Sequence, residues 1–360
     1  MKTPSDVNDN RTTFFMQAMN SLGRTQQKKP LASIVLLTFN QEHFVGDALR
    51  SLLNQDYENL EIVISDDCSR DGTWNQIQKI LNSYTGTKKI ITNQNPINLG
   101  IVRNYEAAFR KTSGELIFMA AGDDISLPNR CSRSIEFWLS CDKDYDLVAA
   151  DAVDMSYTGE YLRIKENDPL EDWTIQRWFK RRPYFFGASQ MITRRLLSLA
   201  PLNHNLPYED QCLVFRSLLM AGAIRLPEAL VCHRRGGLTQ SIGFKIQFGQ
   251  GRSQISKDML GELAELDQFL SDATALNKCS EVEDAVRQRM IYCQIIIELF
   301  KAPISIQAAK KFWQSPHISV NLKLRYLRYY FFYPILAIAH YLRDIFRMVR
   351  SLIAHGRLNK

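Results

Sequence analysis

Short apolar runs alternate with amphipathic stretches over the first 150 residues of this chain. Five runs have the length and β-branched content of strands buried on both faces: residues 32–37, 60–65, 89–92, 115–120 and 146–150. Apolar side chains recur at helical spacing over 44–53, 71–81, 102–110 and after Pro128, which can occupy a first helical turn. The alternation predicts an α/β fold with a Rossmann-like, mostly parallel sheet and helices on both faces.

The pattern is less regular after residue 160. We expect a strand over 184–192, a helix over 208–220 that opens with Glu209 and Asp210, and a strand over 223–231. The spacing is helical again from residue 250 to residue 313 and over the last forty residues. A C-terminal helical region is therefore predicted to follow the sheet.

Polar side chains follow three of the predicted strands at the points where they end. These are Thr38-Phe39-Asn40, Asp66-Asp67 and Asp123-Asp124. In open sheets with parallel strands, ligands bind outside the carboxyl ends of the strands. We therefore expect four carboxylates and two short polar residues to converge on one crevice.

Four carboxylates in one crevice stay ionised together only if a cation lies among them. The sequence contains neither a G-x-x-x-x-G-K-[ST] loop nor a G-x-G-x-x-G turn, so a diphosphate ligand would lack a backbone cradle and would need a divalent ion. Mg²⁺ and Mn²⁺ commonly bind one or two carboxylates together with substrate phosphates. Asp123 and Asp124 are the predicted metal site. The alternative is a helix cap, for which one aspartate would be enough.

Four segments resemble family 2 glycosyltransferases with the GT-A fold, of the type that builds bacterial surface polysaccharides. They are TFNQEHFVGDALRSLLNQDYENLEIVISDDCSRDGT (38–73), NPINLGIVRN (95–104), AAGDDISLP (120–128) and PYEDQCLVFRSLLMAG (207–222). Their order and spacing match the family, and the resemblance covers about residues 31–240. It implies a nucleotide-binding half at 31–152 and an acceptor half at 153–245.

The resemblance also implies roles for individual residues. The residues lining the nucleotide pocket would be Thr38, Phe39, Asn40, Glu42 and Asp66. Asp67 would accept a hydrogen bond from the base, Asp123 would contact the ribose, and Asp124 would bind Mn²⁺ or Mg²⁺. Asp210, next to Glu209, would be the general base that activates an acceptor hydroxyl, with inversion at the anomeric carbon.

Physical chemistry is consistent with these roles. A metal ion stabilises the charge on a leaving nucleoside diphosphate, and a hydroxyl nucleophile needs a positioned base. Asp210 lies near a predicted helix N-terminus, whose dipole favours its ionised form. The alternative for Glu209 and Asp210 is ordinary helix capping.

Three arginines are candidates for contacting the diphosphate. Arg234 and Arg235 follow the strand at 223–231, where family members often carry a Tyr-Arg-x-His-like stretch, but no histidine follows them here. Either arginine could clamp a diphosphate. His233 alone is more often a structural residue. Arg103 either faces the diphosphate or is a solvated helix charge.

The last forty residues carry the whole net charge of +7. Residues 321–360 contain eight basic residues and one acidic residue. Apolar side chains recur at helical spacing between 338 and 352, with arginines on the opposite face. The apolar stretch 329–342 is short for a membrane span and contains Pro334. We therefore expect basic amphipathic helices on an anionic membrane surface. The alternative is a C-terminal helix packed on the body.

Composition limits the remaining possibilities. The chain is 45% hydrophobic and 23% charged, and its seven cysteines form no C-x-x-C pair, which indicates a folded protein with free thiols in a reducing compartment. Residues 1–30 are expected to be a loosely ordered leader, because they lack the pattern of a secretory signal. Residues 246–320 are expected to form a helical extension.

Together these features predict a cytoplasmic, metal-dependent, inverting glycosyltransferase, peripheral on the inner face of the membrane. It would transfer sugar from a nucleotide donor, with UDP favoured, to a saccharide or lipid-linked saccharide in O-antigen, capsule or exopolysaccharide synthesis. A sugar nucleotidyltransferase is a rival, but it would carry a glycine-rich basic loop near the first strand, which TFNQEHF lacks. A non-enzymatic binder of nucleic acid would have a hydrophilic tail, so nucleic acid is not an expected partner.

Overall fold

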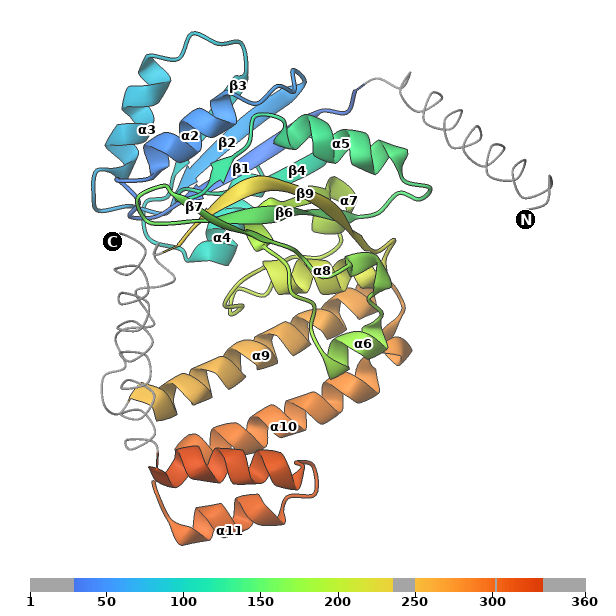
Figure 1. The fold of residues 1–360 in the computed structure, drawn as a ribbon. Helices are drawn as coiled ribbons and strands as arrows, with labels where there is room; N and C mark the ends of the chain where they lie inside the picture. Colours follow the sequence, from blue (N-terminus) through green and yellow to red (C-terminus); the bar gives the residue numbers. More distant parts are fainter. Residues whose placement is uncertain (1–28, 236–249, 302, 333–360) are drawn as a thin grey trace, which may run out of the picture. The chain divides into compact units, whose positions relative to one another are not determined.

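The computed structural model describes residues 29–235, 250–301 and 303–332. These residues divide into two compact units. The first unit contains a nine-stranded sheet and also takes in Gln268–Val282, whereas the second contains the other C-terminal helices (Figure 1).

The N-terminal half of the sheet is parallel, as predicted. Four strands lie in the order β3-β2-β1-β4: β1 (Ala32–Thr38), β2 (Leu60–Asp66), β3 (Lys89–Gln94) and β4 (Leu116–Ala121). Thr38 pairs with Asp66, and Leu37 pairs with Ala121, so these three strands end at the same edge of the sheet.

The other half of the sheet is mixed. Its strands are β5 (Ile125–Ser126), β6 (Leu147–Met155), β7 (Tyr161–Lys165), β8 (Gln190–Thr193) and β9 (Ala223–Arg234). β8 is antiparallel to β4 and β6, β9 is parallel to β6, and β5 and β7 are antiparallel edge strands on β9 and β6. The prediction of a mostly parallel sheet therefore holds for the first half only, because short antiparallel strands complete the second.

Helices cover both faces of the sheet (Figure 1). One face carries α2 (Val45–Leu53), α3 (Thr73–Asn82) and α5 (Arg130–Ser140), and the other carries α4 (Ile101–Phe109), α7 (Arg194–Leu197) and α8 (Asp210–Leu219). The apolar stripe of α2 is buried as its spacing predicted. Burial of each large aliphatic side chain contributes about 1.5–3 kcal/mol, which fixes α2 on the sheet.

Two predicted elements have different bounds. The expected strand over 184–192 is a strand only from Gln190 and is preceded by a 3₁₀ turn, η2 (Gly187–Ser189). The helix expected to begin at Pro128 begins at Arg130, because the Pro128 carbonyl instead accepts a hydrogen bond from the Asp56 N–H. Both differences lie beside the candidate site described below.

Shorter helical elements complete the first unit: η1 (Leu170–Asp172), α6 (Ile175–Lys180) and η3 (Cys279–Glu281). The last part of α9 (Gln250–Ala275) packs on α8 through a buried ion pair. The Arg216 guanidinium donates to both carboxylate oxygens of Asp272, at 2.9 and 2.8 Å, and both side chains are fully buried. Such an arginine requires this partner, because an unpaired buried charge is strongly destabilising.

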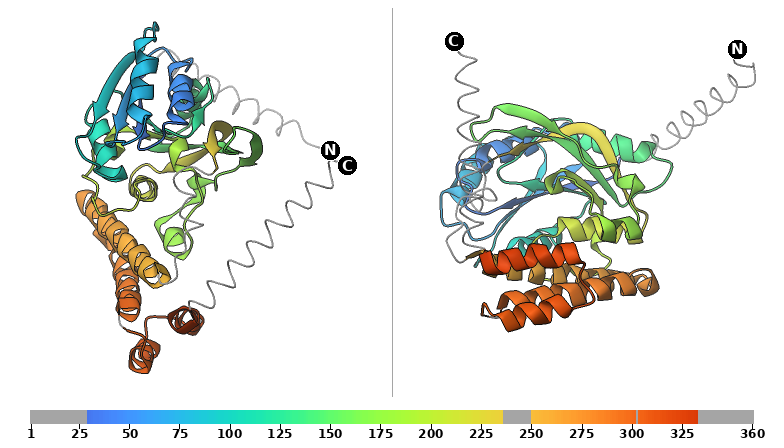
Figure 2. Two further views of the ribbon diagram at one scale, coloured as in Figure 1. Left: turned by 90° about the vertical axis from the view of Figure 1, so that its left-hand side faces the viewer. Right: turned by 60° about the horizontal axis from the view of Figure 1, so that its bottom comes forward.

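The second unit is helical. Figure 2 shows α10 (Glu283–Lys301), α11 (Ile306–Gln314) and the helical residues 320–332 side by side. Aromatic side chains from all three pack around Tyr326, including Tyr292, Phe300 and Phe312. No helix within the described ranges is long and apolar enough to cross a membrane. The amphipathic pattern predicted between residues 338 and 352 lies outside the described residues, as does most of the predicted leader.

Candidate active site

The predicted meeting of strand ends is present at the edge of β1, β2 and β4. The Thr38 hydroxyl donates to Asp66 Oδ1 at 3.0 Å, and the Gly122 N–H donates to the Leu37 carbonyl at 3.0 Å. These bonds connect the end of β1 to the ends of both neighbours. Thr38 and the turn before Asp123 and Asp124 therefore occupy one edge of the sheet.

The loop after β1 is braced against the loop after β2. Asn40 adopts a left-handed conformation (φ 49°), which asparagine tolerates, and its side-chain oxygen accepts the Arg70 N–H at 2.8 Å. Glu42 accepts the Gly72 N–H at 2.7 Å. Phe39, which precedes Asn40, is half-buried. Three of the residues predicted to line the nucleotide pocket thus shape the same wall.

Asp66 and Asp67 are both buried and hydrogen-bonded to their own chain. Asp66 accepts from Thr38 and from the Ser69 N–H at 3.0 Å. Asp67 accepts from the Asn95 amide and from the backbone N–H groups of Leu99 and Gly100, at 2.8–2.9 Å. A carboxylate has about four lone-pair sites, so Asp67 retains about one for a ligand. The three hydrogen bonds of Asp67 hold the loop that leads into α4.

Asp123 and Asp124 are tied to the end of β9 by Arg234. The Arg234 N–H donates to Asp124 Oδ1 at 3.0 Å, and its guanidinium Nε donates to the Asp123 carbonyl at 3.1 Å. The guanidinium also donates to the Tyr157 carbonyl at 2.8 Å and lies 4.8 Å from the centre of the Phe44 ring. Arg234 therefore fixes the position of the aspartate pair with both its backbone and its side chain.

The electrostatics of this pair fit a bound cation. Burial raises the pKa of Asp124 well above its usual range, and the neighbouring Asp123 raises it further. Burial also raises the pKa of Asp123. No group of three or more His, Cys, Asp or Glu side chains gathers within the described residues, so the four predicted carboxylates do not form such a cluster. A divalent ion here would take Asp123 or Asp124 as protein ligands and complete its shell with substrate phosphates and water.

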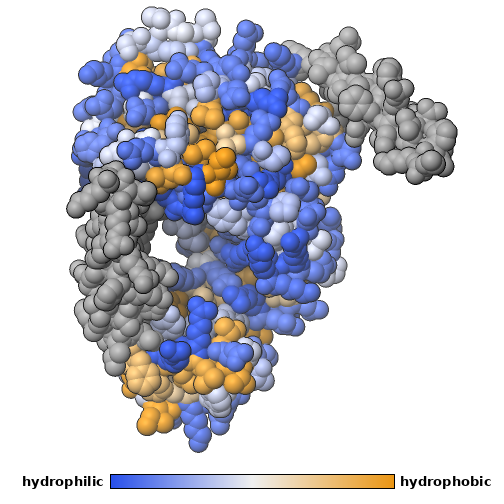
Figure 3. Space-filling model, viewed as in Figure 1, coloured by the Kyte–Doolittle hydropathy of each residue, from blue (hydrophilic) through white to orange (hydrophobic). Residues whose placement is uncertain are grey.

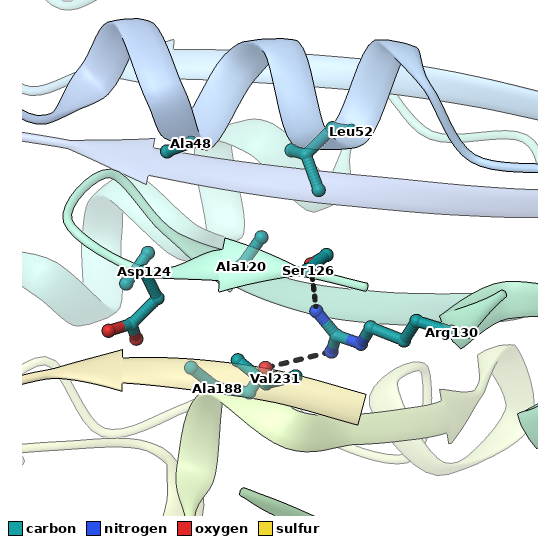
Figure 4. A pocket seen from close by; sticks show the side chains of 9 residues that line it. Ala48, Leu52, Ala120, Asp124, Ser126, Arg130, Ala188 and Val231 are labelled. Atoms are coloured by element: carbon teal, nitrogen blue, oxygen red, sulfur yellow. Dashed lines mark hydrogen bonds between the residues drawn. The ribbon is translucent and has the colours of Figure 1, made fainter. Parts of the chain in front are cut away.

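A buried arginine lies next to Asp124. Arg130 is 1% exposed and donates to Ser126 Oγ at 2.9 Å and to the Ala188 carbonyl at 2.8 Å. Figure 4 shows the Asp124 carboxyl group and the Arg130 guanidinium lining one small pocket. Burial lowers the pKa of Arg130 to about 10, so it remains a cation at neutral pH and offsets part of the charge on Asp124.

The η2 turn connects Asp124 with Asp210. Ala188 lines the pocket that contains Asp124. Gly187, immediately before it, lies directly against Asp210, because a Cβ atom placed on Gly187 would be 2.6 Å from Asp210 Oδ2. Any larger residue at position 187 would displace this carboxylate. The predicted base therefore lies next to Gly187, and the predicted metal site lies next to the following residue, Ala188.

Asp210 and Glu209 open α8 as predicted, but their electrostatics differ from the expectation. Asp210 Oδ1 accepts the Gln211 N–H at 2.7 Å, which lowers its pKa, yet burial outweighs this and raises the pKa overall. Burial, and then repulsion from Asp210, raise the pKa of Glu209 to about 7. Glu209 Oε2 is buried and accepts no hydrogen bond from the described part of the chain. The helix N-terminus alone thus does not keep this pair ionised.

The remaining candidates lie in two different environments. Arg103 is exposed on α4. Arg235 donates to Asp154 Oδ2 at 2.5 Å, away from the Asp123–Asp124 pair. His233 lies 3.3 Å from Asp154 Oδ1, and its ring packs 4.6 Å from Phe186. Burial lowers the pKa of His233, which favours its neutral form.

The sequence model of glycosyl transferase family 2 matches residues 33–198 of this chain. Those residues contain β1, β2, β4 and the Asp123–Asp124 pair. Residues 33–198 belong to glycosyl transferase family 2.

Curated relatives match parts of this family 2 region. The putative glycosyltransferase EpsE of Bacillus subtilis is 29% identical over 33% of this chain and 42% of its own length. The putative colanic acid biosynthesis glycosyl transferase WcaA of Escherichia coli is 35% identical over 29% of this chain and 37% of its own length. The E. coli UDP-Glc:alpha-D-GlcNAc-diphosphoundecaprenol beta-1,3-glucosyltransferase WfaP is 32% identical over 30% and 41%. Each match thus spans less than half of the relative.

Two solved structures illustrate the structural likeness. S. aureus TarS 1–349 in complex with UDP aligns over 75% of this chain and 91% of that chain, at 16% identity and a TM-score of 0.49. The mannosyltransferase PcManGT from Pyrobaculum calidifontis in complex with GDP-Man and Mn²⁺ aligns over 91% and 97%, at 12% identity and a TM-score of 0.48.

Sequence reasoning missed two residues of the candidate site. Arg130 follows a proline on a predicted helix and looks like an ordinary surface charge; only the fold reveals its burial beside Asp124. Gly187 was placed in a strand, although a glycine inside a strand pattern can mark a close backbone approach. That signal was available and could have indicated the contact with Asp210.

The buried state of Glu209 gives a pH prediction. Its folded-state pKa of about 7 exceeds its ordinary value of 4.5, so its contribution to stability is fully present below about pH 4.5 and is lost as the pH rises through about 7. At pH 8 we expect Glu209→Gln to unfold at a higher temperature than the wild type, with a free energy of unfolding greater by up to about 3 kcal/mol. At pH 5 we expect no such gain. Glu283→Gln, at an exposed helix start, is the control. An identical pH dependence in wild type and Glu209→Gln would contradict the buried state.

Proposed function

We propose that this protein transfers a sugar from a nucleoside diphosphate donor to a hydroxyl group of a saccharide acceptor, with inversion at the anomeric carbon. One observation carries the proposal: of the two consecutive η2 residues, Gly187 lies against Asp210 and Ala188 lines a pocket with Asp124. A donor diphosphate near Asp124 and an acceptor hydroxyl near Asp210 would thus lie near the same short turn. The family 2 match over residues 33–198 supports this reaction class.

Each candidate residue has a task in this reaction. In this proposal Thr38, Phe39, Asn40, Glu42, Asp66 and Asp67 would form the nucleotide wall, which their hydrogen bonds support. Asp123 would contact the ribose. Asp124, and secondarily Asp123, would hold Mn²⁺ or Mg²⁺, which when bound neutralises charge on the diphosphate. Arg234 keeps both aspartates in position. Exposed Arg103 is left as a candidate contact to the diphosphate.

The proton transfer is assigned to Asp210. Its carboxylate takes the proton of the acceptor hydroxyl while the oxygen bonds to the anomeric carbon, and the bond from that carbon to the diphosphate oxygen breaks with its electron pair on the leaving group. A base is more effective when its pKa is closer to the working pH, and burial raises that of Asp210. Glu209 is proposed to act beside it as a second buried carboxyl group, whose own pKa is raised by burial and by repulsion from Asp210.

The comparisons favour a UDP-sugar and a lipid-linked acceptor. The name of WfaP gives UDP-Glc as the donor and a diphosphoundecaprenol-linked GlcNAc as the acceptor. The name of WcaA gives colanic acid biosynthesis. By this likeness we assign the present chain to bacterial polysaccharide synthesis. Its place at the inner face of the cytoplasmic membrane is part of the proposal and does not come from these names. The alternatives of a sugar nucleotidyltransferase or a non-enzymatic binder receive no support from the family match.

The surface of the second unit supports membrane association. Apolar side chains gather near its α11 end (Figure 3). Those that are exposed between residues 304 and 332 are Ile304, Ile306, Trp313, Val320, Leu324, Phe331 and Phe332. Basic residues 323, 325 and 328 lie among them, a combination that suits an anionic membrane interface.

Replacement of the proposed base tests the reaction. We expect Asp210→Asn to reduce kcat by about 10²–10⁴ with little change in KM for the nucleotide sugar, because only the proton acceptor is lost. The measurement is nucleotide release from a panel of UDP- and GDP-sugars, with saccharide and synthetic prenyl-diphosphate saccharide acceptors. Asp284→Asn, an exposed carboxylate in the first turn of α10, is the matched control. Release that survives in Asp210→Asn would rule out the assigned base.

Deletion of residues 321–360 tests the membrane assignment. Vesicles containing anionic lipid should carry the full chain upward in a flotation gradient, and the truncated chain should stay at the bottom. High salt should weaken flotation of the full chain, since the attraction is partly electrostatic. Equal flotation of both chains would show that the tail is not the membrane anchor.

A further inference from the structure

A buried carboxylate surrounded by cations lies beside the candidate site. Asp154, at the end of β6, is 1% exposed. Arg235 Nη2 and Arg163 Nε donate to its Oδ2 at 2.5 and 3.1 Å, and Lys165 Nζ lies 3.9 Å from its Oδ1. We call Asp154, Arg163, Lys165 and Arg235 the Asp154 cluster.

The sheet register creates this cluster. Asp154 pairs with Arg163 on β7 and with His233 on β9, so side chains from three neighbouring strands lie in one row. Successive side chains of a strand point to opposite faces. Around the end of β9, His233 and Arg235 accordingly turn toward Asp154, whereas Arg234 between them turns toward Asp123.

The cluster carries more positive charge than its carboxylate requires. Burial alone would raise the pKa of Asp154, but the hydrogen bonds from Arg235, Arg163 and His233 lower it to about 2. One carboxylate is therefore matched by three cations, which leaves an excess of two positive charges. The carboxylate side chain is 2% exposed, whereas those of Arg163 and Arg235 are 69% and 31% exposed. An anion arriving from solvent would meet the guanidinium groups first.

Aromatic rings connect this cluster to the proposed base. Lys165 Nζ lies 4.9 Å from the centre of the Tyr184 ring, and Phe186 packs on His233. The next residue, Gly187, touches Asp210. Tyr184 and Gly187 are three residues apart, a span of at most about 11 Å. Partly exposed rings of this kind offer apolar faces to a sugar, while the arginines match phosphate geometry.

We propose that the Asp154 cluster binds a phosphate or diphosphate group of an anionic acceptor. This inference rests on the proposed function and narrows its acceptor to a phosphate-bearing saccharide. The acceptor is favoured over the donor because Arg234, on the other side of β9, is the arginine that faces the Asp123–Asp124 pair. The Tyr184–Gly187 segment then leads from the acceptor phosphate to the hydroxyl that Asp210 deprotonates.

Inorganic pyrophosphate is the direct probe. Its binding to the full-length protein is measured by calorimetry in EDTA, so that a metal-dependent donor site does not contribute. We expect Arg163→Gln to raise the Kd for pyrophosphate about tenfold through the loss of one charge-assisted contact. Arg163 is exposed, so the fold should persist, and thermal unfolding confirms this.

Arg287→Gln is the matched control, because Arg287 is also 69% exposed and also pairs with one carboxylate, on α10. It should bind pyrophosphate like the wild type. The absence of binding to the wild type, or an equal Kd in Arg163→Gln and wild type, would overturn the proposal. So would an equal loss in Arg287→Gln, because binding would then reflect net charge alone.

A kinetic comparison distinguishes acceptor from donor. With a synthetic prenyl-diphosphate saccharide as acceptor, Arg163→Gln should raise the KM for this acceptor and leave the KM for the nucleotide sugar unchanged. A rise in the nucleotide-sugar KM instead would assign the cluster to the donor and overturn the acceptor role. Failure of the proposed function would give a different result. The wild type would then show no transferase activity, while its pyrophosphate binding would still be weakened in Arg163→Gln.

Discussion

Two adjacent carboxyl groups buried at the end of a strand repel each other, and much of the candidate site serves to hold them there. Asp123 and Asp124 follow β4 at once, and β5, only two residues long, then pairs with β9. That pairing brings Arg234 against both aspartates. Arg130, fully buried beneath them, supplies a second positive charge. Two buried carboxylates side by side are electrostatically unfavourable unless a cation lies near them, so the arrangement suits a ligand that binds together with a cation.

The same constraint separates two sides of the site. Arg234 and Arg235 are consecutive on the chain, but the alternation of side chains along a strand directs them to different carboxylates. Arg234 stabilises the Asp123–Asp124 pair, whereas Arg235 joins the Asp154 cluster. The η2 turn has Ala188 near Asp124 and Gly187 against Asp210. The proposed donor chemistry and the proposed acceptor chemistry are thereby brought to one short turn.

The parallel half of the fold was predictable because its strands are buried on both faces and therefore appear as continuous apolar runs. Thr38, Asp66 and Asp124 were found for the same reason, since they stand where those runs stop. The second half was less predictable: β5 and β8 have two and four residues, too few for a periodic signal. The burial of Arg130 and the contact between Gly187 and Asp210 depend on tertiary packing, which local patterns do not encode.

Mn²⁺ binding in the presence of UDP is the measurement that decides whether Asp124 holds a divalent ion together with a donor diphosphate. The measurement is free Mn²⁺ by electron paramagnetic resonance, for wild type and Asp124→Asn, with and without UDP. Asparagine can still accept the Arg234 N–H through its Oδ1, so the turn should persist. We expect UDP to enable the wild type to retain Mn²⁺ and Asp124→Asn to lose this retention. Equal retention by both proteins would contradict it.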